Sequence, residues 1–135
     1  MKNLVLVGRL IFGAWMLVNG INHFFVPLYA EPTGHTLLAT QLMAALTHSK
    51  LYDVAMTMQL VGGALILAGV YTPVALCVLM PVSTCAVYWA VVLEHQPLGA
   101  LLSLVAFGLN GLLMLAYIDY YRGVLQRYAP ALGEA

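Results

Sequence analysis

Charged side chains are scarce in this sequence. Lysine, arginine, aspartate and glutamate together make up 7% of its 135 residues, whereas an ordinary soluble domain carries about a quarter. The five basic and five acidic residues cancel to a formal net charge of zero, so nothing attracts the chain to nucleic acid or to an acidic partner. Because 63% of the residues are hydrophobic, the chain has too little polar surface for a soluble protein. We expect an integral membrane protein whose main partner is the lipid bilayer.

Cysteine is equally rare. The only two cysteines are Cys77 and Cys85, and on one helix their positions would differ in height by roughly 12 Å, which is beyond disulfide reach. The sequence has no CxxC redox pair, no zinc-like spacing of Cys and His, and no flavin motif. We therefore expect no metal site, and we interpret both cysteines as small apolar side chains buried in the protein.

Four long apolar stretches are present instead. They cover approximately residues 4–26, 51–70, 74–93 and 98–118, and turns that contain proline or polar residues end them. Each has about 20 residues, which at about 1.5 Å per residue is enough to cross a hydrocarbon core of roughly 30 Å. Backbone polar groups in lipid must be bonded within the segment, so such stretches are helices. The predicted fold is all-α, a single membrane domain over residues 1–135 that forms a compact bundle of four transmembrane helices.

The basic residues predict the orientation of this bundle. Lys2, Arg9, Arg122 and Arg127 flank the two chain termini, and only Lys50 lies in the opposite loops. An even number of spans puts both termini on the same side, and the excess of positive charge favours the cytoplasm for that side.

A further, shorter helix is expected on the outer side, between the first two spans. Residues 28–50 connect the first two spans, and residues 36–46 within them are helix-forming and largely apolar. This stretch is too short to cross a bilayer. We expect an interfacial or re-entrant helix that partly covers the outer mouth of the bundle.

Polar residues inside the spans are the main candidates for function. They are Arg9, Asn19 and His23 in the first span, Gln59 in the second and Asn110 in the fourth. Each needs a partner in lipid, and glycines on the same helix faces allow close approach of neighbouring helices. Two interpretations stay open. The polar groups either bond one another and fix helix register, or they form a ligand or proton site between the first, second and fourth spans.

Arg9 and the histidines each have alternatives of their own. Arg9 lies near the cytoplasmic end of its span, so it either extends to lipid phosphates or faces inward to bind an anion or polarise a carbonyl, such as that of a quinone. His23, His35, His48 and His95 all fall near the outer side. Scattered interfacial histidines, a proton relay and a metal site are the three interpretations.

The first two spans resemble those of the DoxX-like membrane family. The resemblance rests on GRLIFG at residues 8–13 and NGINHF at 19–24, then on QLVGG at 59–63 and GVYTP at 69–73. The last two spans are similar only in hydropathy. The resemblance implies a compact four-helix bundle in a bacterial inner membrane. Some members of this family resemble the membrane subunit of thiosulfate:quinone oxidoreductase, and others have no assigned chemistry.

Two functional classes follow. The first is a quinone-linked redox protein, or the membrane subunit of an oxidoreductase complex, that receives electrons from a redox partner protein. In that class His23 is the catalytic residue that moves protons, and Arg9, Asn19, Gln59 and Asn110 bind the quinone cofactor. The alternative is a non-catalytic scaffold, assembly factor or bundle that binds lipid or a small ligand.

Overall fold

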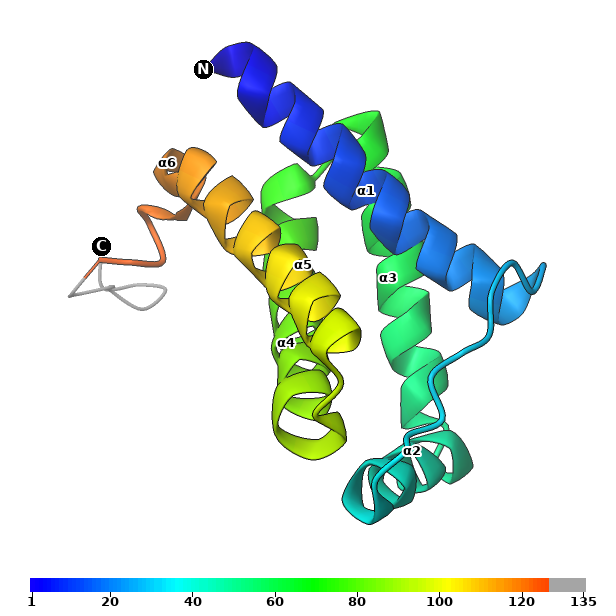
Figure 1. Cartoon of the computed structure of the whole chain (residues 1–135). Helices are drawn as coiled ribbons and strands as arrows, with labels where there is room; N and C mark the ends of the chain where they lie inside the picture. The colour runs from blue at the N-terminus through cyan, green and yellow to red at the C-terminus, as the bar shows by residue number, and fades with distance from the viewer. Residues whose placement is uncertain (127–135) are drawn as a thin grey trace, which may run out of the picture.

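The computed structural model describes residues 1–126, and all regular structure within them is helical (Figure 1). The elements in chain order are α1 (Lys2–Phe24), α2 (Leu37–His48), α3 (Leu51–Ala68), α4 (Thr72–Tyr88), η1 (Trp89–Glu94), α5 (Pro97–Ala116) and α6 (Ile118–Tyr121). The all-α prediction is confirmed.

The four predicted spans are confirmed as four long apolar helices. Their bounds are Lys2–Phe24, Leu51–Ala68, Thr72–Glu94 and Pro97–Ala116, and each is long enough to cross a membrane. The third consists of α4 and η1, a π-helical segment that continues α4 to Glu94. The sequence did not predict this segment. A π-helix places about one extra residue in a turn, so it changes the direction in which the side chains after Tyr88 point.

The helices α1 and α3 form a particularly close pair because glycines lie at their contact. A Cβ atom added at Gly20 would lie 2.5 Å from the Cβ of Leu60, and one added at Gly63 would lie 2.5 Å from the backbone nitrogen of Leu17. Only glycine permits such an approach of two helix backbones. The predicted role of glycines on these faces is confirmed. Apolar side chains from α1, α3, α4 and α5, among them Phe12, Ile66, Leu79 and Ala106, form the buried core between the helices.

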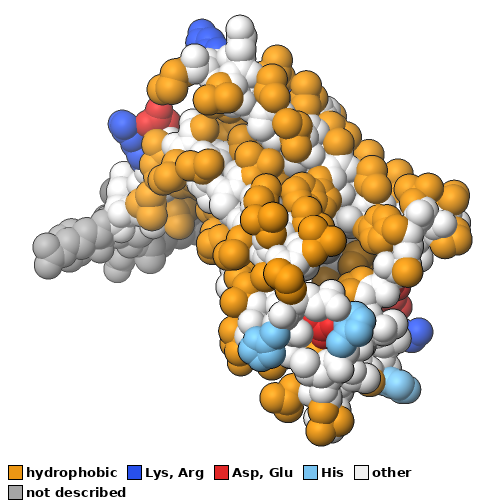
Figure 2. All heavy atoms as spheres, in the orientation of Figure 1, with side chains coloured by type: hydrophobic (Ala, Val, Ile, Leu, Met, Phe, Trp, Pro, Cys, Tyr) orange, Lys and Arg blue, Asp and Glu red, His pale blue; other side chains and the backbone are white. Residues whose placement is uncertain are grey.

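Most apolar side chains nevertheless face outward. In the most apolar 18-residue window of each of the four long helices, no more than 22% of the residues are buried in the protein. Figure 2 shows hydrophobic side chains over most of the visible surface, with charged and histidine side chains gathered towards its two ends. This band of apolar surface needs lipid, which supports an integral membrane location.

The cysteine interpretation is wrong. Cys77 and Cys85 are both exposed on the surface of α4, whose buried face contains Ala75, Leu76 and Leu79. The outer surface of a membrane bundle is as apolar as its interior, so an apolar side chain gives no indication of which way it faces.

The predicted helix between the first two spans is confirmed as α2. It is attached to η1 by Thr36, whose hydroxyl donates to the carbonyl of Leu93 (2.5 Å), and by Trp89, whose ring N–H donates to the carbonyl of Ala39 (3.2 Å). With 12 residues α2 extends for about 18 Å, too short to cross the bilayer. Its location along the membrane surface remains a prediction.

The bundle has two distinct ends (Figure 1). The end that holds Met1, the α3–α4 turn and α6 is called the α6 end here, and the end that holds Phe24, α2 and the η1–α5 turn is called the α2 end. The α6 end carries Lys2 and Arg122, and the α2 end carries Lys50. Arg127, which also entered the orientation prediction, lies outside the described residues.

Candidate functional site

His23 lies between two carboxylates at the α2 end. Its Nδ1 is 2.5 Å from Oε1 of Glu31, and its Nε2 is 2.7 Å from Oδ1 of Asp53. The three residues come from the last turn of α1, the segment after it and the first turn of α3. The His23 side chain is 15% exposed, whereas Glu31 and Asp53 are 37% and 43% exposed. The cluster therefore connects water with a histidine inside the protein.

The contacts fix how many protons this cluster holds. An ionised carboxylate only accepts hydrogen bonds, and a neutral imidazole has one donor and one acceptor nitrogen. Each of the two N···O contacts of His23 needs one hydrogen. The cluster thus holds two protons, either as a doubly protonated ring between two carboxylates or as a neutral ring with one protonated carboxyl. These two arrangements differ only by movement of a proton along a hydrogen bond.

Aromatic rings and a lysine surround the cluster. The His23 ring makes edge-on contacts with Phe24 and Tyr52, at centroid distances of 4.7 Å and 5.1 Å. Nζ of Lys50 lies 3.9 Å from Oδ2 of Asp53. The rings limit the access of water to the imidazole, and the ammonium group places a positive charge beside the Asp53 carboxylate.

Asn22 brings the acidic segment back onto α1. Its side-chain oxygen accepts the backbone N–H groups of Leu28 (2.7 Å) and Tyr29 (2.8 Å). This turn is what allows Glu31 to reach His23. Asn22 is not among the candidate residues named from the sequence, and nothing in the sequence revealed this positioning role.

A chain of side-chain hydrogen bonds extends from this segment into the bundle. The Tyr29 hydroxyl donates to Oδ1 of Asn19 (2.5 Å), and Nδ2 of Asn19 donates to Oε1 of the buried Gln59 (2.9 Å). Partial burial and the charge of Glu31 raise the pKa of Tyr29, so its hydroxyl stays protonated and remains a donor. The structure thus brings three predicted site residues together on the α1–α3 pair, with His23 at the α2 end and Asn19 and Gln59 further along the helices, Gln59 in the middle of α3.

Arg9 and Asn110 lie elsewhere. Arg9 is at the α6 end, roughly 20 Å from His23 along α1, with its guanidinium over Gly69. Asn110 is fully buried on α5, where its Nδ2 donates to the hydroxyl of Ser83 on α4 (3.3 Å). The five predicted residues therefore occupy three separate places.

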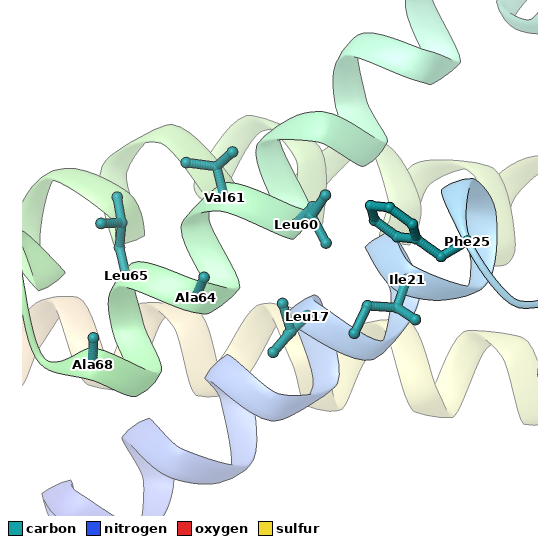
Figure 3. Close-up of a pocket in the computed structure, with 8 residues that line it drawn as sticks. All are labelled: Leu17, Ile21, Phe25, Leu60, Val61, Ala64, Leu65 and Ala68. Carbon is teal, nitrogen blue, oxygen red and sulfur yellow. The ribbon is translucent and has the colours of Figure 1, made fainter.

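An apolar groove runs along the same pair of helices. Its volume is about 780 Å³. Figure 3 shows side chains from the end of α1 and from α3 pointing towards it, with Phe25 near one end. Its lining is entirely apolar: Leu17, Ile21, Phe25, Leu60, Val61, Ala64, Leu65 and Ala68. A groove of this kind suits a hydrocarbon chain.

The other histidines have different surroundings. The backbone N–H of His35 donates to Oε2 of Glu94 (2.8 Å), and its ring contacts the same carboxylate. Among the described residues, the ring of His48 bonds only to the Ala44 carbonyl of its own helix, at 2.7 Å. Within residues 1–126, no group of three or more His, Cys, Asp or Glu side chains is arranged to hold a metal ion.

Comparison with known proteins gives one match. The sequence model of the DoxX family matches residues 4–92, about two thirds of the chain. No curated protein and no solved structure matches it. The matched region contains α1, α2, α3, α4 and most of η1, including Asn19, His23, Glu31, Asp53 and Gln59. The chain belongs to the DoxX family.

Proposed function

We propose that this DoxX-family membrane protein takes part in quinone-linked redox chemistry, with Glu31, His23 and Asp53 as its proton-handling site. The observation that supports this most directly is the contact of both His23 ring nitrogens with carboxylates, at 2.5 and 2.7 Å. A histidine held in this way can receive a proton on one side and release one on the other.

The chemistry requires protons at the membrane interior. Conversion of a quinone to a quinol consumes two electrons and two protons. Both carboxylates of the cluster are more than a third exposed, so they exchange protons with water, and the more buried His23 passes a proton from one carboxylate to the other. The amide groups of Asn19 and Gln59 are suited to hold a polar headgroup. We assign the supply of the two electrons to a redox partner protein.

The apolar groove supports the choice of a quinone over a water-soluble substrate. Quinones of membranes carry long hydrocarbon tails, and the groove on α1 and α3 is lined only by apolar side chains. Phe25 in the groove is two residues beyond His23, and Leu60 is about two turns along α3 from Asp53. The groove and the polar cluster thus lie on the same two helices, α1 and α3.

The direction of proton exchange depends on the orientation in the membrane. We place the α2 end on the outer side of a bacterial inner membrane and both termini in the cytoplasm, because the basic residues Lys2, Arg9 and Arg122 lie towards the α6 end and only Lys50 lies at the other. His23 would then exchange protons with the outer aqueous phase.

Quinone that remains bound during purification tests the proposal. The protein is purified from its native membrane in mild detergent, extracted with organic solvent and analysed by mass spectrometry. We expect quinone in the wild type and in His48→Gln, whose histidine bonds within α2 and to no other described residue. We expect a loss of roughly tenfold in His23→Gln, because the charge-assisted contacts that hold Glu31 and Asp53 beside the headgroup residues are removed. Absence of quinone from the wild type, or equal amounts in all three proteins, contradicts the proposal.

A non-catalytic scaffold is the second candidate. It is favoured by the polar pairs that bond to one another inside the bundle, Asn19 with Gln59 (2.9 Å) and Asn110 with Ser83 (3.3 Å), although Oδ1 of Asn110 is buried without a partner among the described residues. Such pairs fix helix register without any ligand. Under this alternative His23→Gln lowers stability and leaves the content of small molecules unchanged.

A further inference from the structure

A second cavity lies at the α6 end, far from the His23 cluster. Its volume is about 450 Å³. It lies between the α3–α4 turn and the end of α5 with α6, and its lining is Gly69, Tyr71, Thr72, Pro73, Val74, Tyr117 and Tyr120. Unlike the groove on α1 and α3, it has polar groups in its wall.

Thr72 provides the first of these groups. Its side chain lines the cavity and its residue is only 2% exposed, yet its hydroxyl has no hydrogen-bond partner within residues 1–126. Buried hydroxyl groups in proteins are bonded with few exceptions, so this one is available to a ligand.

The positively charged guanidinium of Arg9 lies against Gly69, one residue of this wall. Its Nη1 lies 3.0 Å from the position that a Cβ of Gly69 would occupy, and Gly69 lines the cavity. Its Nε is buried without a hydrogen-bond partner in the part of the chain that the structure describes, and no described carboxylate lies within 4.0 Å of the guanidinium. The nearby Asp119 forms an ion pair with Arg122 at 2.8 Å. A partly buried guanidinium without a described carboxylate partner favours an anion beside it.

The N-terminus of α4 is a third group that favours a negatively charged ligand. This helix of 17 residues begins at Thr72, and no side chain caps its N-terminus. Its first backbone N–H groups lack partners within the helix and form the positive end of its dipole. The guanidinium, the hydroxyl and the helix N-terminus together provide hydrogen-bond donors and positive charge, and none of the three carries a negative charge.

We propose that this cavity binds a phosphate group, carried by an anionic phospholipid or present as free phosphate. Arg9 supplies the charge and planar donors that suit phosphate oxygens, and Thr72 donates its hydroxyl. Tyr71, Tyr117 and Tyr120 are residues typical of the headgroup level of a membrane, which fits a site at the end of the bundle. The proposal does not depend on the quinone proposal, because the two sites lie at opposite ends.

Native mass spectrometry in detergent tests this site. The delipidated full chain is titrated with phosphatidylglycerol, with zwitterionic phosphatidylcholine in parallel. We expect saturation at one phosphatidylglycerol per chain and weaker retention of phosphatidylcholine. Arg9→Gln should weaken binding by at least about tenfold and Thr72→Val by several-fold. Lys2→Gln is the matched control, because Lys2 is an exposed cation at the same end, and it should bind as the wild type does.

Inorganic phosphate distinguishes the two sources. Displacement of the lipid by millimolar phosphate, absent in Arg9→Gln, indicates a site for free phosphate, and lipid retention unaffected by phosphate indicates a headgroup site; both support the proposal. If Arg9→Gln fails to fold, the affinity of the nearly isosteric Thr72→Val for phosphatidylglycerol tests the proposal instead. Wild-type affinity in the folded variants, equal binding of phosphatidylcholine, or displacement of the lipid by an uncharged short-chain quinone overturns it.

Discussion

Replacement of Gly63 by alanine should weaken the contact between α1 and α3. The added Cβ would lie 2.5 Å from the backbone nitrogen of Leu17 and 2.8 Å from the carbonyl oxygen of Gly13. Both are backbone atoms, so no side-chain rotation relieves the overlap and the two helices must separate. Gly108 on α5 is the matched control, because a Cβ there meets nothing within 4 Å.

The expected change in the free energy of unfolding is the difference between two effects. Removal of a glycine from a helix stabilises it by up to about 1 kcal/mol at either position. Only Gly63→Ala carries the cost of overpacking, about 1–3 kcal/mol. Gly108→Ala should therefore be neutral or slightly stabilising, and the two variants should differ by about 1–3 kcal/mol.

Unfolding by SDS from mild detergent micelles measures this difference. Trp15 on α1 packs against the core, so tryptophan fluorescence reports separation of the helices. We expect Gly63→Ala to unfold at a clearly lower SDS fraction than Gly108→Ala. Equal midpoints would refute the inference that the glycine contact holds α1 against α3.

Two further predictions concern the segment before α2 and the orientation. Asn22→Ala should release the backbone turn that holds Glu31 at His23, so limited proteolysis between residues 26 and 36 should become several-fold faster. The control variant at the exposed Asn3, Asn3→Ala, should leave the cleavage rate unchanged. Equal cleavage rates in the two variants would contradict the positioning role of Asn22. In a cysteine-free background, a membrane-impermeant thiol reagent should label His48→Cys from the outer side and Gly123→Cys only from the cytoplasm; the reverse pattern would show that the orientation is inverted.

The spans could be predicted because they depend on local properties. Length and hydropathy alone decide whether a segment crosses a bilayer, and the predicted spans agree with the four long helices to within a few residues. The same holds for α2, whose apolar stretch is too short to span. The π-helical η1 was not predictable in this way. Its residues Trp89 and Leu93 make hydrogen bonds to the segment around α2, about 50 residues away in sequence.

The candidate site could be predicted only in part. An intramembrane histidine or asparagine is recognisable as unusual in any apolar span, which singled out His23 and Asn19. The carboxylates that complete the cluster are 8 and 30 residues away in sequence. Glu31 reaches His23 only because Asn22 turns the chain, and Asp53 only because α3 begins beside the end of α1. Asn110 was chosen by the same rule as His23, and only the structure places it beside Ser83 instead.

The central claim is that the cluster of Glu31, His23 and Asp53 serves a quinone site. Titration of the purified protein in detergent with a short-chain quinone, followed by calorimetry, tests it most directly. The account predicts saturable binding to the wild type and to His48→Gln, and binding at least about tenfold weaker in folded His23→Gln, because the charge-assisted contacts that hold Glu31 and Asp53 at the site are lost. Equal affinity of His23→Gln and the wild type, or no binding to either, would contradict it.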